Sequence, residues 1–297
     1  MHNKIPARII HIYAAPAGQS GELPLFNQAA LTNARLLHPD FEHVLFGKDE
    51  MEGFLRKEFP QFQEIIASFP QPIQRLDFFR YLAVYRLGGF YFDTDVFLAR
   101  SLKPLLNSEC VFAFEELTIS KFLRENCGMD WELANYGFGA APNNAFLGAI
   151  IKNCIRALKE PIWANQMLRG IPRYFQAPFF APVTTGPGMV SRTFAENPEL
   201  VRNVTVLFPD DVCDERTWHQ FGNFGVHMQQ GSWRSDGSYL RRRLANLWES
   251  RARRRLMRES LARGKTRSIP LRAQDGHSPS PSRFSESLTV STEESMG

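Results

Sequence analysis

The stretch that decides the fold is "RLDFFRYLAVYRLGGFYFDTDV", residues 75–96. Apolar residues recur with helical spacing up to Gly88, a good stop signal, so the pattern predicts a helix over residues 73–87. The second glycine precedes three aromatic residues that predict a buried strand, and this strand runs into Asp93-Thr94-Asp95. A helix followed at once by such a strand favours an α/β domain.

Two pairs of charged residues belong to this block. Asp77 and Arg80 are three residues apart on the predicted helix, so their side chains lie side by side; taken alone, they indicate an ordinary surface ion pair. Asp93 and Asp95 alternate on the predicted strand and share one face of it. A D-x-D tripeptide alone is typical of a turn or a solvated edge. Neighbouring carboxylates raise each other's pKa unless a cation joins them, and their oxygens suit Mg²⁺ or Mn²⁺.

The flanking sequence extends the α/β pattern. "ARIIHIYAA" predicts a first buried strand, residues 24–37 a helix, and "EHVLFG" a second strand, the order expected for a parallel sheet. Further along, "CVFAFEE" and "VTVLFPDDV" predict strands, whereas "ELANYGFGAAP" reads as a loop leading into a helix from about Ala145. A short helix is expected after Gly188.

Charge is distributed unevenly over the 297 residues. Residues 241–297 contain 13 Lys and Arg against 6 Asp and Glu, so the remainder is mildly acidic. This pattern excludes a nucleic-acid footprint spread over the fold. The expected organisation is a catalytic domain over residues 1–238, a basic amphipathic helix over 239–263 that contacts a membrane peripherally or packs on the body, and a disordered Ser/Pro-rich tail over 264–297.

The four cysteines are widely spaced and form no C-x-x-C pair, which favours a reducing compartment. His11 and Tyr13 interrupt the short apolar stretch near the N-terminus, so it makes a poor signal sequence. The apolar runs are also shorter than the roughly 18 residues of a spanning helix. The sequence therefore predicts a cytoplasmic protein, at most peripheral on the inner face of the membrane.

The block from Arg75 to Asp95 resembles the glycosyltransferases with a DXD-containing sugar-binding region. That family includes fungal Golgi mannosyltransferases and capsular or surface polysaccharide glycosyltransferases, and the clostridial glucosylating toxins are similar more remotely. The resemblance is dense over residues 75–96 and thin over residues 4–235, where "KIPARIIHIY", "HPDFEHVLF" and the "GSW" that follows His227 match the family pattern.

The resemblance implies a GT-A fold, a single α/β domain with a mostly parallel sheet. It also implies a nucleotide-diphosphate sugar donor, UDP- or GDP-linked, and a divalent cation, usually Mn²⁺, with Mg²⁺ as the alternative. Asp95 would ligate the metal, and Asp93 would hold the ribose or a metal-bound water. Asp77 and Arg80 would bind hydroxyl groups of the donor sugar.

Other residues receive roles from the same resemblance. His227 is a candidate metal ligand, and Ser232 with Trp233 are candidate diphosphate donors, all carried on a mobile C-terminal loop. Tyr13 could stack on the base or serve as a core aromatic residue. Asn135 aligns with a loop that faces the acceptor, although an ordinary turn is the simpler interpretation.

The family retains anomeric configuration, and front-face attack by the acceptor hydroxyl is the expected mechanism. The acceptor would be a glycan, a glycolipid or another hydroxyl compound in cell-surface polysaccharide or glycolipid synthesis. One alternative is a haloacid-dehalogenase-type phosphohydrolase that uses Asp93 and Asp95, with Asp210-Asp211 as a second acidic pair. Another is an effector that glycosylates protein, because only the acceptor would differ.

Overall fold

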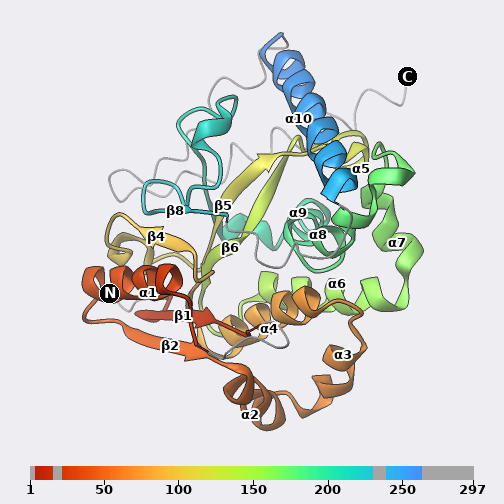
Figure 1. The fold of residues 1–297 in the computed structure, drawn as a ribbon. Helices are drawn as coiled ribbons and strands as arrows, with labels where there is room; N and C mark the ends of the chain where they lie inside the picture. The colour runs from red at the N-terminus through yellow and green to blue at the C-terminus, as the bar shows by residue number, and fades with distance from the viewer. Residues whose placement is uncertain (1–3, 16–21, 230–238, 263–297) are drawn as a thin grey trace.

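A computed structural model describes residues 4–15, 22–229 and 239–262 of the chain (Figure 1). A central sheet has the strand order β2-β1-β3-β6-β5-β7. Of its six strands, five run in one direction, and β6 is antiparallel to both of its neighbours. The predicted α/β fold with a mostly parallel sheet is therefore confirmed.

The strands of the central sheet are β1 (Arg8–Ile12), β2 (Glu42–Phe46), β3 (Gly89–Phe92), β5 (Cys110–Leu117), β6 (Trp131–Ala140) and β7 (Val204–Leu207). A separate antiparallel pair consists of β4 (Val96–Leu98) and β8 (Gly225–His227). The α-helices are α1 (Leu25–Leu37), α2 (Lys48–Glu58), α3 (Gln63–Ser68), α4 (Pro72–Leu87), α5 (Lys121–Asn126), α6 (Ala145–Lys159), α7 (Pro161–Asn165), α8 (Phe180–Thr184), α9 (Pro187–Glu196) and α10 (Tyr239–Ala262).

Side chains alternate along β3 between two hydrophobic cores. Tyr91 packs into the larger core, with apolar residues of α4, α6 and α9. Phe90 and Phe92 point to the opposite face and pack with apolar residues of α1, β4 and the chain before β8. The central sheet is therefore covered on both sides, as a largely parallel sheet must be.

Helix α4 and strand β3 form as the sequence predicts, and only Gly88 connects them. Pro72 occupies the first turn of α4, and the backbone N–H of Gln71 donates to the Gln74 side-chain oxygen at 3.0 Å. The helix ends at Gly88, whose φ of 65° is costly for residues with a Cβ. A Cβ at Gly88 would also lie 2.7 Å from the Pro142 ring. The chain thus enters β3 directly from the end of α4.

The prediction of a loop at "ELANYGFGAAP" is wrong, because these residues form most of β6. Gly137 and Gly139 suggest a loop in the sequence. In the sheet, however, a Cβ at Gly137 would lie 2.9 Å from the Phe92 ring, and one at Gly139 would lie 2.4 Å from the Phe90 ring. The glycines therefore make room for the aromatic residues of β3, a use of glycine within a strand rather than at its end.

Helix α10 packs on the body of the protein. Leu256 is buried in a cluster that includes Trp248 and Ala252, and Arg253 forms ion pairs with Glu116 and Glu249. Much of the apolar stripe that the sequence offers to a membrane is therefore covered by protein. Leu244 and Leu247 stay exposed.

The predicted domain limits at residues 238 and 263 stay predictions, and the predicted tail over residues 264–297 lies outside the described residues. In the described part of the chain, no helix combines the length and apolar character required to cross a membrane.

Candidate active site

The two carboxylates of the D-x-D motif are positioned by a turn. Strand β3 ends at Phe92, and the chain turns through residues 93–95 before β4 begins at Val96. The backbone N–H of Val96 donates to the Asp93 carbonyl at 3.2 Å. The expectation of strand alternation through Asp95 is therefore corrected: both acids are close to each other because the chain turns at the end of β3.

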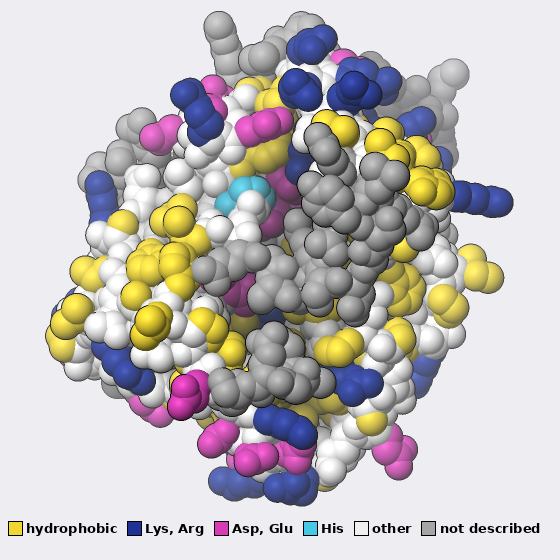
Figure 2. Space-filling model, viewed as in Figure 1, with side chains coloured by type: hydrophobic (Ala, Val, Ile, Leu, Met, Phe, Trp, Pro, Cys, Tyr) yellow, Lys and Arg dark blue, Asp and Glu magenta, His cyan; other side chains and the backbone are white. Residues whose placement is uncertain are grey.

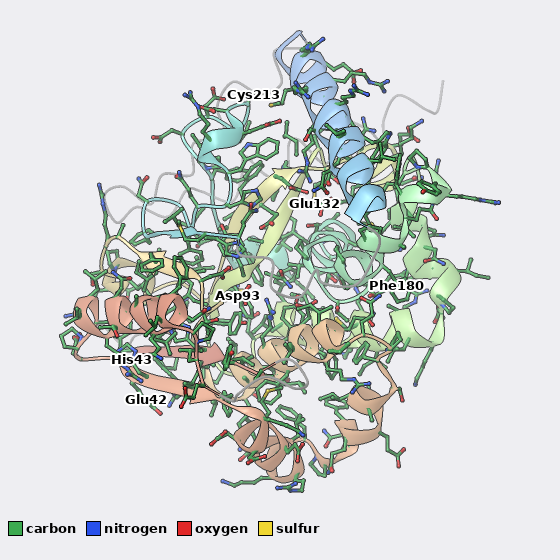
Figure 3. The ribbon with its side chains drawn as sticks, in the orientation of Figure 1. Glu42, His43, Asp93, Glu132, Phe180 and Cys213 are labelled. Atoms are coloured by element: carbon green, nitrogen blue, oxygen red, sulfur yellow. The ribbon has the colours of Figure 1, made fainter. Side chains whose placement is uncertain are left out.

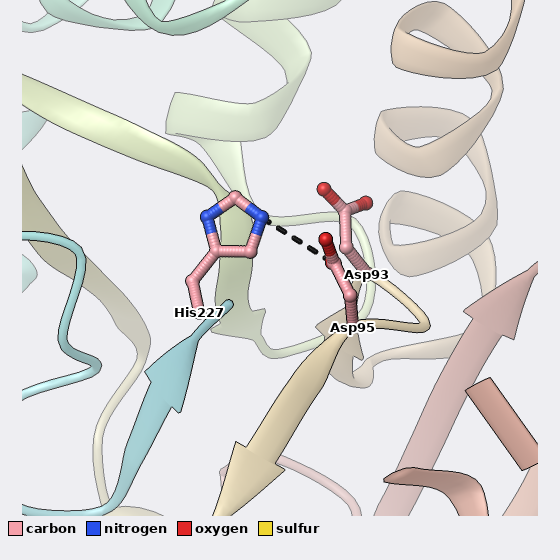
Figure 4. A group of neighbouring side chains, drawn as sticks. All are labelled: Asp93, Asp95 and His227. Carbon is pink, nitrogen blue, oxygen red and sulfur yellow. Dashed lines mark ion pairs between the residues drawn. The ribbon is translucent and has the colours of Figure 1, made fainter. Parts of the chain in front are cut away.

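His227 reaches this turn on strand β8. In the register of β4 and β8, Val96 lies opposite His227, and the N–H of Met228 donates to the Asp95 carbonyl at 3.0 Å. His227 Nε2 lies 3.2 Å from Asp95 Oδ1 (Figure 4). The sequence interpretation placed His227 on a mobile loop. Instead, backbone pairing holds it against the D-x-D turn.

Asp93, Asp95 and His227 form a compact group. Each offers one ligand atom, and these atoms all lie within 4.8 Å of one another. The ring of Tyr136 stacks on His227, with centroids 4.3 Å apart. This stacking limits rotation of the imidazole, so that Nε2 faces the carboxylates.

Arg80 connects α4 to the same turn. Its guanidinium lies 3.1 Å from Asp77 Oδ1 and 3.2 Å from Asp93 Oδ1, and it donates to the Asn135 carbonyl at 2.9 Å. The hydroxyl of Tyr91 also donates to Asp93 Oδ1, and the Arg80 guanidinium lies over the Tyr91 ring, 4.8 Å from its centroid. Asp93 is thus held from two sides.

Asp77 is buried with both carboxylate oxygens occupied. Oδ1 accepts from the side-chain amide of Asn135 at 3.0 Å, and Oδ2 accepts from the Thr185 hydroxyl at 2.9 Å. Asn135 lies in β6 and also donates to the Tyr81 hydroxyl at 3.3 Å. The sugar-binding role of Asp77 and the acceptor role of Asn135 stay predictions. The contacts show both side chains engaged within the protein.

Burial and the neighbouring charges have opposite effects on the pKa values of this group. Burial raises the pKa of Asp77 and of Asp93, and the Arg80 charge opposes the rise in both. For His227, burial favours the neutral ring, but the hydrogen bond to Asp95 and the nearby carboxylates raise its pKa above the ordinary value. The carboxylates thus occupy a site where a bound cation would relieve the cost of their charge.

The other predicted site residues are Tyr13, Ser232 and Trp233. Tyr13 directly follows β1, beside the end of β3, and its hydroxyl donates to the Glu22 carbonyl at 3.2 Å. Its stacking role stays a prediction. Ser232 and Trp233 lie outside the described residues. Figure 3 shows Asp93 at the end of the central sheet, whereas Glu132 lies toward α10.

Several residues of this region carry no signal in the sequence. Glu115 and His219 form a pair, with Oε1 and Nδ1 3.4 Å apart, and the His219 and His227 rings lie 6.5 Å apart. The second oxygen of Glu115 is buried without a hydrogen-bond partner in the described part of the chain. Thr185 belongs to "TTGPG", a loop to which the sequence assigned no chemistry. Only the fold brings these residues to the site.

The residues present fit a divalent cation. Two carboxylates and one imidazole nitrogen converge, and oxygen with nitrogen donors suits Mn²⁺ as well as Mg²⁺. The ligand atoms come from the turn that Arg80 supports and from β8, which pairs with β4 directly after that turn, so the set exists without large rearrangement. Asp93, Asp95 and His227 are the residues that would hold the ion.

Comparison with known proteins gives this site a context. Residues 27–112 match the family described as the glycosyltransferase sugar-binding region containing a DXD motif. This stretch contains Asp77, Arg80 and the D-x-D turn. The predicted resemblance to this family is confirmed over residues 27–112.

Curated relatives are fungal enzymes. Inositol phosphoceramide mannosyltransferase 3 of Schizosaccharomyces pombe is 42% identical over 71 residues, which are 24% of this chain and 20% of the relative. Mannosyl phosphorylinositol ceramide synthase SUR1 of Saccharomyces cerevisiae is 25% identical over 213 residues, 71% of this chain and 48% of the relative. The chain thus spans between a fifth and a half of these relatives. The names of these relatives specify mannosyl transfer, which agrees with the predicted glycosyltransferase class.

Solved structures with some likeness are also glycosyltransferases. The PaToxG glycosyltransferase has a TM-score of 0.42 at 12% identity, covering 66% of this chain and 72% of that one. The UDP-bound glycosyltransferase domain from the YGT toxin has a TM-score of 0.40 at 11% identity, covering 69% and 80%.

The expected cytoplasmic location is wrong in the light of the curated relatives. Their names specify inositol phosphoceramide or mannosyl phosphorylinositol ceramide. Ceramide is a membrane lipid, so these relatives act on a substrate held in a membrane rather than free in the cytoplasm.

Proposed function

We propose that this protein transfers a hexose from a nucleotide-diphosphate sugar to a hydroxyl group of an inositol-containing glycolipid, with a divalent metal bound at the D-x-D turn. The observation that carries the proposal is the convergence of Asp93, Asp95 and His227 next to the Asp77–Arg80 pair. Asp77, Arg80, Asp93 and Asp95 lie within residues 27–112, which match the glycosyltransferase sugar-binding region, whereas His227 lies outside that match.

The metal would supply Lewis-acid stabilisation of the diphosphate as the bond to the sugar breaks. Asp93 and Asp95 would provide ligand atoms from the turn after β3, and His227 would provide one from β8. Arg80 keeps Asp93 in place through its ion pair, while Tyr91 donates a hydrogen bond to the same oxygen. Such a preorganised set needs little reorganisation during the reaction.

The acceptor part of the proposal comes from the curated relatives, which are named for inositol phosphoceramide. Mannose is the first hexose to test for the same reason, and the nucleotide is uridine or guanosine. Retention of anomeric configuration belongs to the proposal, with the family resemblance as its support. Product NMR that shows inversion would remove that part.

The phosphohydrolase alternative receives no support from the geometry. Asp93 follows the third strand of the chain rather than the first, and Asp210 and Asp211 are exposed. Neither belongs to the group of ligand atoms around Asp93 in the described residues.

The test is a panel of UDP- and GDP-hexoses with Mn²⁺ and inositol phosphoceramide in detergent, scored for lipid product and released nucleoside diphosphate. We expect one donor to react and Asp95→Asn to lose activity. Asp210→Asn is the matched control, because only the phosphohydrolase alternative gives it a role. No product from any donor, or equal activity in Asp95→Asn, would refute the proposal.

A further inference from the structure

An exposed apolar surface lies beside the candidate active site. We call it the apolar rim and define it by Leu25, Phe26, Phe97, Val226 and Met228. The Phe26 and Phe97 rings pack edge to face with centroids 5.3 Å apart, and Phe97 lies opposite Val226 in the β4–β8 pair. Residues opposite each other share one face of a strand pair, so the partly buried Phe97 lies on one surface with Val226 and Phe26. Leu25 and Met228 are exposed next to Phe26 and His227 in the chain. Figure 2 shows hydrophobic side chains gathered over α1 and β4.

The outer face of α1 extends this surface. Leu25, Ala29, Thr32 and Leu36 follow helical spacing and are exposed, whereas Ala30, Leu31 and Ala34 pack inward. Leu25 is 83% exposed and Leu36 is 77% exposed. A single exposed leucine is ordinary, but these leucines enlarge an apolar surface that already includes Phe26 and Phe97, and contiguous apolar surfaces mark interaction sites.

The apolar rim is built on the strands that hold the site. His227 lies between Val226 and Met228, and Phe97 lies two residues after Asp95. The side-chain amide of Asn27 in α1 donates to the Thr94 hydroxyl at 2.8 Å. A hydrophobic phase in contact with the rim would therefore lie next to the D-x-D turn.

The charged residues around the apolar rim indicate which kind of partner it can bind. Residues 23–39, 96–108 and 222–229 contain no Asp or Glu. Arg35 and Arg100 lie in these segments and are exposed, whereas the exposed Glu22 and Asp40 lie just outside them. Apolar side chains bordered by arginine complement a bilayer, in which acyl chains lie beneath anionic headgroups.

We infer that the apolar rim and the outer face of α1 dock onto an anionic phospholipid membrane, so that a lipid acceptor presents its headgroup to the D-x-D turn. The inference rests on the proposed function for the acceptor, but docking itself requires neither donor nor metal. It differs from membrane contact through α10, whose Trp248 and Leu256 pack on the protein.

The test is flotation of the full chain with phosphatidylcholine vesicles that contain phosphatidylinositol, without nucleotide sugar or metal. We expect Leu25→Glu/Leu36→Glu to reduce vesicle binding about tenfold or more, because two apolar side chains leave the bilayer and two negative charges enter its surface. Ile162→Glu is the matched control: Ile162 is 84% exposed but lies on α7, away from the rim. We expect its binding to be unchanged.

Three results would overturn the inference: wild-type protein that does not float, a Leu25→Glu/Leu36→Glu variant that floats like wild type, or loss of binding only in Leu244→Glu/Leu247→Glu on α10. Light scattering measures the oligomeric state of the same proteins. If wild type is a dimer, and Leu25→Glu/Leu36→Glu is a monomer that still floats like wild type, the rim is a dimer interface and the inference is also overturned. Donor turnover with acceptor in detergent is measured on the same variants. This measurement tests the proposed function separately from docking. A protein without transferase activity can still bind vesicles, and an active protein can fail to bind them.

Discussion

Arg80 bridges Asp77 and Asp93, with guanidinium nitrogens 3.1 Å from Asp77 Oδ1 and 3.2 Å from Asp93 Oδ1. The contact joins the middle of α4 to the turn after β3. Because Asp77 is in turn held by Asn135 and Thr185, the network fixes Asp93 relative to three separate elements of the fold. The position of one candidate metal ligand therefore depends on a buried ion pair that is distant from solvent.

Replacing Arg80 should destabilise the fold as well as the site. Arg80→Met removes the cation between two carboxylates, and Asp77 is left buried with its charge uncompensated. We expect a loss of about 3–5 kcal/mol in the free energy of unfolding, measured by urea denaturation.

The control for Arg80 is Arg86→Met. Arg86 also forms an ion pair, with Glu58, but half of its side chain is exposed. A surface pair contributes about 1 kcal/mol or less, so the effect should be small. Equal losses in the two variants would show that Arg80 contributes no more than a surface arginine.

Thr185 provides a finer test of the same network. Thr185→Val keeps the side-chain shape but removes the hydroxyl that donates to Asp77 at 2.9 Å. We expect a loss of about 1–3 kcal/mol, because a buried carboxylate oxygen is left without its donor. Thr32→Val is the comparison, since Thr32 is exposed on α1 and should change stability by less than about 1 kcal/mol. Unchanged stability in Thr185→Val would contradict the observed contact.

His11 should make stability depend on pH. It is buried in β1 with Nδ1 2.9 Å from the Phe92 carbonyl, and burial lowers its pKa from 6.5 to about 4. The unfolded chain therefore binds a proton below pH 6.5 that the folded protein takes up only near pH 4. Stability should fall by about 3 kcal/mol from this residue as the pH drops through that window.

The measurement for His11 is the urea midpoint between pH 7 and pH 4 for wild type and His11→Asn, which keeps a donor for Phe92. We expect a shallower pH dependence in the variant. Identical slopes would mean that folding does not shift the pKa of His11, which would contradict the effect of its burial.

The core of the fold could be predicted from the sequence because its signals are local. Helix α4, the glycine stop and strand β3 follow from apolar spacing and turn chemistry within one short segment. The same block contains Asp77, Arg80, Asp93 and Asp95, so these four site residues can be identified from one segment of the sequence.

The rest depends on contacts between distant segments. The family resemblance already made His227 a candidate ligand, but its contact with Asp95 arises because β8 pairs with β4. Thr185 meets Asp77 across more than a hundred residues. No spacing rule reports such pairs. Strand β6 was missed for another reason: its glycines resemble a loop until the rings that they accommodate on β3 are seen.

That explanation of β6 is testable with alanine. Gly139→Ala places a Cβ against the Phe90 ring, and overpacking should cost about 1–3 kcal/mol in thermal unfolding. Gly53→Ala in α2 meets nothing within 4 Å and should stabilise by about 0.5–1 kcal/mol through helix propensity. A neutral or stabilising Gly139→Ala would contradict the packing argument.

The most direct test of the account is Mn²⁺ binding, measured by calorimetry in the presence of GDP or UDP. We expect one site per chain in wild-type protein, with affinity reduced at least about tenfold in Asp95→Asn and in His227→Ala, because each variant removes a ligand. Asp210→Asn should bind like wild type. Equal Mn²⁺ affinity in wild type, Asp95→Asn and His227→Ala would contradict the claim that these residues hold the metal.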